Sequence, residues 1–341
     1  MKTLVEYITE RVDDPKSYIK ANIDNVSDET ADHIVKIMQQ SGSIDKEKII
    51  QYMAERGIED CWKMIIRILR DDNDDYSNFV QLINGELNVP DSDKFIKGND
   101  YHKLFKGVFS DDTLEELYNL NIARNGIARG RGEILCRLIL KDANNGAGDL
   151  STSKGTFELK ANGGRLRGNT SITAISFNDA TKKILGNNFA TKYPNIAKYG
   201  VFANEENLCN WMALMKEGVD ENTFAQRVAE VLISQYNDKG PKSDIEKIVK
   251  SEGYYNNDDV KDYKSSFHKL VGSVQLYFYH NTEKFDYIVV GYPKKGLSDY
   301  VCIKGADLSS VGKIFKNNKI DYVSWPRIGG AQDAAVKIYK A

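Results

Sequence analysis

The chain has 341 residues, of which 41% are hydrophobic and 28% charged, with 47 basic and 49 acidic residues and a formal net charge of −2. This composition is typical of a folded globular protein and excludes a disordered or collagen-like chain. The chain has no apolar run long enough to span a bilayer and turns charged too early for a secretion signal, so we expect a cytoplasmic protein without membrane association.

The first hundred residues are expected to be helical and mostly polar. Apolar residues recur at helical spacing after Ser27, again after Ile44, and a third time from Met64 to Leu69. The acidic run 71–75 and the turn at 89–93 are signals that break a helix. We therefore expect a helical N-terminal region over residues 1–93, serving recognition or assembly, and a separate domain over residues 94–341. The alternative is that the N-terminal helices pack directly on that domain.

From about residue 101 the pattern changes to alternating helices and strands. Helices are expected over residues 112–120, around 134–139, over 221–236 and over 308–315. A strand hairpin is expected over 149–161, and further strands over 274–279, 287–292, 300–304 and 320–325. This alternation predicts an α/β or α+β fold, with a mixed sheet flanked by helices.

One hairpin carries the residues with the clearest chemistry. The strand period of two places Glu158 and Lys160 on one face and turns Phe157 and Leu159 toward the core. Asp149 starts the preceding strand, so a short hairpin would bring its carboxylate beside that of Glu158. Two carboxylates suit Mg²⁺, with Mn²⁺ as an alternative, and such an ion can polarise a phosphodiester and activate water. An ammonium on the same face can orient that water, so the set suits phosphodiester hydrolysis.

The context of this hairpin makes the pattern more specific. An acidic residue followed by any residue and Lys occurs four times in the chain and indicates little by itself. Only the copy at Glu158 sits in an alternating apolar strand one hairpin after an Asp. It also lies in a segment, residues 122–168, with nine basic and four acidic residues and a net charge of +5, while the rest of the chain carries −7. Such a segment can hold phosphate, although a solvated basic face is the alternative.

These residues resemble the PD-(D/E)xK nuclease superfamily, whose core places an Asp and a (D/E)xK triplet on adjacent strands after a helix that often bears a Glu. Asp149 matches the first element, Glu158 and Lys160 the second, and Glu133 the helix acid, while Gly148 replaces the usual proline. The resemblance covers roughly residues 120–168. It implies a restriction-endonuclease-like fold and a metal-dependent DNA endonuclease of restriction or phage type. It also implies that Asp149 and Glu158 are metal ligands and that Lys160 orients the water.

Each of these residues also has a simpler interpretation. Glu133 and Arg137 are four apart on a helix, which fits a surface ion pair. Asp149 fits a turn residue that hydrogen-bonds to its own loop. Glu158 and Lys160 fit a charge pair on a solvated strand.

Four arginines are candidates for DNA contact. Arg165 and Arg167 lie in a glycine-rich segment that would let the guanidinium groups approach phosphate, although an exposed flexible loop is the alternative. Arg129 and Arg131 lie at a glycine-rich helix entry that lacks the Walker and dinucleotide-binding patterns.

The leading interpretation is a Mg²⁺-dependent endonuclease that hydrolyses phosphodiester bonds in DNA, with DNA as its partner and a homodimer left open. A non-catalytic nucleic-acid-binding or phage structural protein with a nuclease-like fold is the alternative. A third interpretation is an interaction module that binds through its acidic N-terminal helices.

Overall fold

The structure is a computed structural model, which describes residues 15–22, 26–32, 46–124, 127–161, 164–166, 174–186, 189–201, 205–234, 241–251, 254–256, 263–291, 297, 299–305, 320–322 and 336–340. These residues form a mixed α/β fold, as the sequence predicted, in which helices predominate. None of the helices in these ranges combines the length and the apolar character that crossing a membrane requires.

The N-terminal part consists of short helices. Their bounds are α2 Pro15–Asn22, α4 Lys46–Glu55, η1 Glu59–Cys61, α5 Trp62–Arg70, α6 Asn73–Asn84, α7 Ser92–Lys97, α8 Tyr101–Phe105 and α9 Asp111–Asn119. Helices α4 and α5 confirm two of the three expected N-terminal helices, and the one expected after Ser27 is described only as far as residue 32. Asp72, in the acidic run, accepts hydrogen bonds from the backbone N–H groups of Asp74 and Asp75 and so caps α6.

The next segment contains two hairpins around one helix. Strands β1 Ile122–Arg124 and β2 Ile127–Arg129 form the first hairpin, which the sequence did not predict. Helix α10 spans Glu133–Ile139, as expected. Strands β3 Leu150–Thr152 and β4 Gly155–Lys160 then pair antiparallel, which confirms the expected hairpin.

The central sheet has the strand order β3-β4-β6-β7 and is mixed. Strands β6 Tyr287–Gly291 and β7 Tyr300–Lys304 were both expected, and β6 pairs parallel with β4 but antiparallel with β7. A parallel pair needs a long crossover to bring the chain back to the same end of the sheet. Helix α17, Tyr263–Glu283, directly precedes β6 and completes that crossover.

Helix α17 shows that the strand expected over residues 274–279 was wrong. That segment is rich in Val, Tyr and Phe, which favour strands. Leu270, Val274 and Phe278, however, are spaced by four residues and are all buried in one hydrophobic cluster. Burial of this helical stripe outweighs the local preference for strand.

The remaining elements form a helical group and a small sheet. The helices are α11 Ala174–Leu185, α12 Phe189–Lys192, α13 Pro194–Tyr199, α14 Glu205–Lys216, α15 Glu221–Ile233, α16 Lys242–Ser251 and η4 Tyr254–Asn256. Strands β5 Gly164–Leu166, β8 Ile320–Tyr322 and β9 Val336–Lys340 form an antiparallel sheet of order β5-β9-β8. Helix α15 confirms the helix expected at 221–236 as far as Ile233, and residues 235–236 lie outside the described residues. The helix expected at 308–315 and residues 323–325 of the last expected strand lie outside the described residues.

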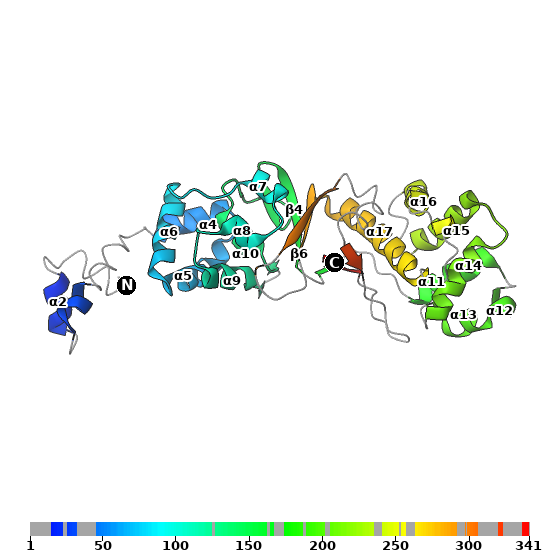
Figure 1. Ribbon diagram of the computed structural model, residues 1–341, viewed down its shortest axis with the longest axis horizontal. Coiled ribbons are helices and arrows are strands. Elements are labelled where there is room, and N and C mark those ends of the chain that lie inside the picture. The colour runs from blue at the N-terminus through cyan, green and yellow to red at the C-terminus, as the bar shows by residue number, and fades with distance from the viewer. Residues whose placement is uncertain are drawn as a thin grey trace.

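The two faces of the central sheet belong to two different hydrophobic clusters. Phe157, Leu159 and Val289 pack in a cluster with the helices from α4 to α10. Ile288 and Val290 point the other way and pack in a second cluster with the helices from α12 to α17. Figure 1 shows the corresponding arrangement, with α4–α10 on one side of β4 and β6 and the helices α11–α16 on the other.

The boundary expected between residues 93 and 94 lies within the first of these clusters. Hydrogen bonds also cross it, because Asp75 accepts from the backbone N–H of Ser110 at 2.7 Å and Asp142 accepts from the backbone N–H of Ser92 at 2.8 Å. The hydroxyl of Tyr52 donates to the carbonyl oxygen of Leu138 at 2.9 Å. The division into two independent domains stays a prediction, which a truncation can test.

Candidate active site

The β3–β4 hairpin brings Asp149 and Glu158 opposite each other. Leu150 pairs with Phe157 in the antiparallel ladder. The residue before Leu150, Asp149, therefore lies opposite the residue after Phe157, Glu158. Oδ2 of Asp149 accepts a hydrogen bond of 2.8 Å from the backbone N–H of Leu159, which fixes the carboxylate against the second strand. The short hairpin postulated from the sequence therefore places the two carboxylates together.

Gly148 explains why the residue before Asp149 is not a proline. Its φ is +78°, in the left-handed region that favours glycine. Proline has φ fixed at about −65° and cannot adopt this conformation. A Cβ at this position would also lie 3.2 Å from the carbonyl oxygen of Phe157. The turn that precedes Asp149 therefore has a backbone conformation that glycine favours and proline cannot adopt.

Glu158 is the centre of a buried group of polar side chains. Its Oε1 forms an ion pair with Nζ of Lys160 and accepts a hydrogen bond from the hydroxyl of Tyr279 on helix α17. The Lys160 ammonium lies 5.3 Å from the centre of the Tyr279 ring. Glu158 is only 6% exposed, so the solvated charge pair considered from the sequence does not describe these residues.

Glu133 adds a second buried acid at the start of helix α10. Its Oε1 accepts a hydrogen bond from the backbone N–H of Gly130, and its side chain is buried. Burial raises the pKa of Glu133 to about 8, and the negative charge of Asp149 adds to the rise. Burial and the charge of Glu158 raise the pKa of Asp149 to about 6. Three acids thus share one buried region in which each carboxylate disfavours ionisation of its neighbour.

Arg137 is buried and hydrogen-bonds to the backbone around this site. It does not form the surface ion pair with Glu133 that the sequence suggested as an alternative. It is 6% exposed, and its guanidinium donates to three backbone carbonyl oxygens. Nε contacts Asp149 at 2.7 Å, Nη2 contacts Gly148 at 2.9 Å, and Nη1 contacts Arg56 at 2.9 Å. Arg137 therefore ties the turn that carries Asp149 to the N-terminal helices. Its desolvation lowers its own pKa.

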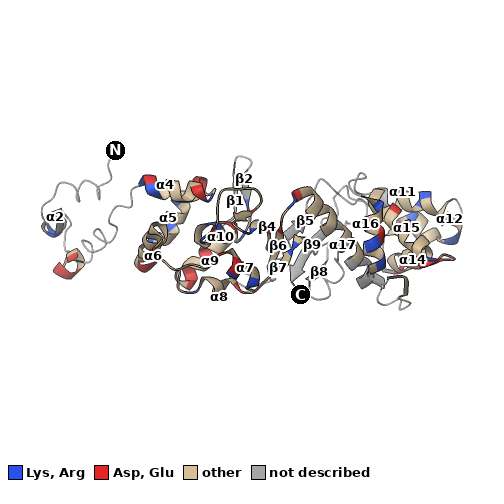
Figure 2. Cartoon of the chain, turned by 90° about the horizontal axis from the view of Figure 1, so that it is seen from above, with Lys and Arg blue, Asp and Glu red and all other residues tan. Residues whose placement is uncertain are grey.

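The four arginines expected to contact DNA have different surroundings. Arg129 forms an ion pair of 2.7 Å with Asp60 and a hydrogen bond to the carbonyl oxygen of Gly57, and its side chain is 13% exposed. Arg131 is exposed. Figure 2 shows the β1–β2 hairpin, which ends at Arg129, next to α10. Arg165 belongs to strand β5, but its side chain is not among those described, and Arg167 lies outside the described residues.

The donor set fits a hard divalent cation. Carboxylate oxygens are the ligands that Mg²⁺ prefers, and one or two carboxylates suffice because the ion keeps waters or takes up substrate phosphate. Asp149 and Glu158 supply such a pair, and the raised pKa values of Asp149 and Glu133 mark a site where a positive ion would relieve repulsion. Within the described ranges, no group of three or more His, Cys, Asp or Glu side chains is arranged to hold a metal by itself.

Sequence reasoning missed Tyr279 and Arg137 as parts of the site. Tyr279 was assigned to a strand, and the four-residue spacing of Leu270, Val274 and Phe278 is the signal that would have placed it on a helix. The role of Arg137 had no signal in the sequence, because its acceptors are backbone carbonyls, one of them 81 residues away.

The comparisons with known proteins yield no relative. No family model matches the chain, and neither a curated protein nor a solved structure matches it.

Proposed function

We propose that the chain is a divalent-metal-dependent endonuclease that hydrolyses phosphodiester bonds in DNA. The observation that carries the proposal is the meeting of Asp149, Glu158 and Lys160 on one face of the β3–β4 hairpin, in a buried region that also contains Glu133. Resemblance to the PD-(D/E)xK superfamily supports the same assignment, since it implies an Asp and a (D/E)xK triplet on adjacent strands after a helix bearing a Glu.

Each residue has a separate role in this proposal. Asp149 and Glu158 would hold a Mg²⁺ ion, which supplies positive charge next to the scissile phosphate. Lys160, on the same face, orients the attacking water and neutralises charge that develops on the phosphate. Tyr279 holds Oε1 of Glu158 by a hydrogen bond and leaves Oε2 available, since no hydrogen bond from another described residue reaches it. Glu133, with a pKa of about 8, can hold or release a proton near neutral pH.

The alternative is a nucleic-acid-binding protein without catalysis. One experiment distinguishes the endonuclease from the non-catalytic binding protein. Supercoiled plasmid is incubated with the full chain and Mg²⁺, Mn²⁺ or EDTA. We expect nicking with either ion and none with EDTA. Binding of plasmid without nicking in both metals would support the alternative.

Two isosteric variants test the residues. Asp149→Asn and Glu158→Gln should abolish nicking and preserve DNA binding in EDTA, because each removes a proposed ligand and not a phosphate contact. Glu116→Gln on α9 removes an exposed acid and should nick at the wild-type rate. Full activity in Asp149→Asn or Glu158→Gln would overturn the site assignment.

A further inference from the structure

Helix α5 presents a basic surface, which lies outside the basic segment of residues 122–168. Ile65, Ile68 and Leu69 are buried in the first hydrophobic cluster. Lys63, Arg67 and Arg70 follow one another by four and three residues, so they share the opposite face, and all three are exposed. The helix contains no acidic residue. Its outer face therefore carries three positive charges in a chain whose net charge is negative.

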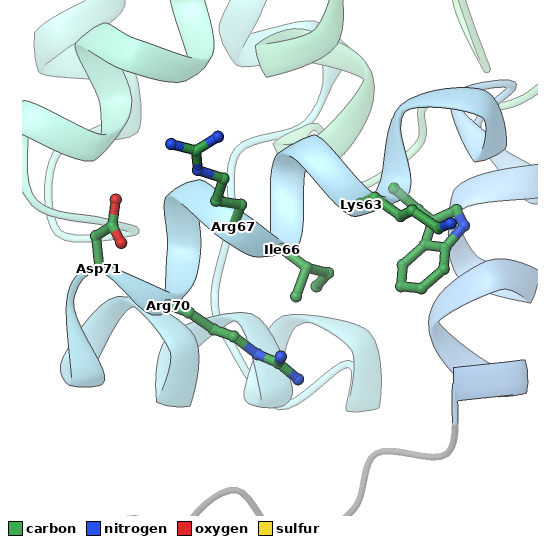
Figure 3. Close-up of a pocket in the computed structure, with 6 residues that line it drawn as sticks. Lys63, Ile66, Arg67, Arg70 and Asp71 are labelled. Atoms are coloured by element: carbon green, nitrogen blue, oxygen red, sulfur yellow. The ribbon is translucent and has the colours of Figure 1, made fainter. Parts of the chain in front are cut away.

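This face is hollowed into a pocket of about 420 Å³. Figure 3 shows the residues that line it, which are Trp62, Lys63, Ile66, Arg67, Arg70 and Asp71. We call it the α5 pocket. Its aromatic member, Trp62, is partly buried and has the ammonium groups of Lys46 and Lys63 each 5.8 Å from its ring centre. The pocket thus combines a flat aromatic ring with several cations.

The cations of the α5 pocket have no carboxylate partner among the described residues. Lys63, Arg67 and Arg70 form no ion pair there, although Asp71 lines the same pocket. Arg129, by contrast, is paired with Asp60. The guanidinium of Arg70 lies 5.2 Å from the ring centre of Tyr76, a cation–π contact that leaves the charge without a carboxylate partner among the described residues. Like charges on one helix face destabilise that face unless an anion binds there.

We infer that the α5 pocket binds a single strand of nucleic acid, with a base stacked on Trp62 and neighbouring phosphates held by Lys63, Arg67 and Arg70. Cations beside an aromatic ring are the combination that holds single strands without reading their sequence, because every base has a flat face. A duplex offers only its phosphates, since its bases are already stacked. The inference rests on the proposed function in that the strand would belong to the DNA substrate.

The experiment measures binding of a labelled oligothymidylate of about twelve nucleotides to the full chain in EDTA, where no cleavage occurs. The double variant Arg67→Gln/Arg70→Gln should weaken binding by about tenfold or more at low salt. It should also reduce the slope of log affinity against log salt by roughly 1.4, because each phosphate contact on a single strand contributes about 0.7. Lys97→Gln/Lys106→Gln removes two exposed charges elsewhere and should leave the slope within error of wild type.

Trp62→Leu tests stacking separately. It should weaken oligothymidylate binding on the order of tenfold and leave binding of a blunt duplex unchanged. Tyr199→Leu is the matched control, because Tyr199 is an exposed aromatic residue with Lys198 4.7 Å from its ring centre, and it should have no effect. A thermal melt of each variant establishes that it is folded.

Three results would overturn the inference. Wild-type affinity in Arg67→Gln/Arg70→Gln would exclude the α5 pocket as a strand site. Equal losses for strand and duplex in Trp62→Leu would exclude stacking. Competition by an oligoglutamate as strong as that by oligothymidylate would indicate an acidic protein partner instead. These outcomes are independent of nicking: a chain that nicks plasmid but fails this test retains the proposed function, and one that binds through α5 but never nicks retains only the strand site.

Discussion

Arg137 donates a hydrogen bond of 2.7 Å from Nε to the backbone carbonyl oxygen of Asp149. The same guanidinium contacts the carbonyl oxygens of Gly148 and Arg56, so one side chain connects the turn before β3 to the N-terminal helices. The position of the Asp149 carboxylate therefore depends on a residue that does not face the proposed substrate.

Replacement of this guanidinium should affect both stability and cleavage. Arg137→Lys keeps the charge but cannot reach three carbonyls in a planar fork, and it leaves buried acceptors without a partner. We expect a loss of about 3 kcal/mol or more in the free energy of unfolding, and a fall in nicking. Lys141→Arg, which keeps the charge of an exposed residue close by in the sequence, should alter neither. Wild-type nicking by Arg137→Lys would show that the turn keeps Asp149 in place without it.

The acids of the site predict a dependence of stability on pH. The folded-state pKa of Glu133 is raised to about 8, so the folded chain binds this proton more tightly than the unfolded chain. Protonated Glu133 therefore stabilises the folded chain. This contribution is fully present below the unfolded-state pKa of Glu133 and is lost as pH rises through about 8. Since the pKa of Asp149 is raised only to about 6, the decline from pH 6 to pH 8 belongs mainly to Glu133.

The measurement is thermal or urea unfolding in EDTA between pH 6 and pH 8, the range set by the pKa values of Asp149 and Glu133. We expect wild-type stability to fall across it and Glu133→Gln to be flatter, because the amide is neutral at every pH and its oxygen still accepts from Gly130. Addition of Mg²⁺ should reduce the wild-type slope by favouring the ionised acids. Identical slopes in wild type and Glu133→Gln would contradict the raised pKa.

Tyr279 is expected to position Glu158 without taking part in DNA binding. Tyr279→Phe removes the hydroxyl that donates to Glu158 and keeps the ring beneath Lys160. We expect nicking to fall by about tenfold with unchanged DNA affinity, and the free energy of unfolding to fall by about 1 kcal/mol. Tyr277→Phe is a control on the same helix. The hydroxyl of Tyr277 donates a hydrogen bond of 2.6 Å to Asp244, which is not part of the site. An equal loss of nicking in both variants would point to a general effect on α17.

The N-terminal helices are expected to be necessary for a stable core. Ile65 and Leu69 belong to the same cluster as Phe157 and Val289, so removal of residues 1–93 would expose apolar surface. We expect fragment 94–341 to aggregate and fragment 46–341, which keeps every member of that cluster, to stay in solution. Solubility and a thermal melt of the two fragments decide between the domain division and the packed alternative. A folded, soluble fragment 94–341 would support the division expected from the sequence.

The sequence by itself determined the elements whose side chains alternate at a clear period. The hairpin of β3 and β4 was predictable because Phe157 and Leu159 alternate with Glu158 and Lys160, and that period also places the two charges on one face. Strands β6 and β7 were predictable because they are short runs rich in β-branched and aromatic residues, and helix α15 because its apolar residues recur at helical spacing.

The tertiary structure decided what depends on residues far apart in the chain. Residues 274–279 belong to helix α17 because burial of Leu270, Val274 and Phe278 in one cluster outweighs the strand preference of the neighbouring Val, Tyr and Phe residues. Arg129 is held by Asp60, 69 residues away, and Glu158 by Tyr279, 121 residues away. The pKa of Glu133 is raised because packing buries it near Asp149, and burial is a property of the assembled core, not of the local sequence.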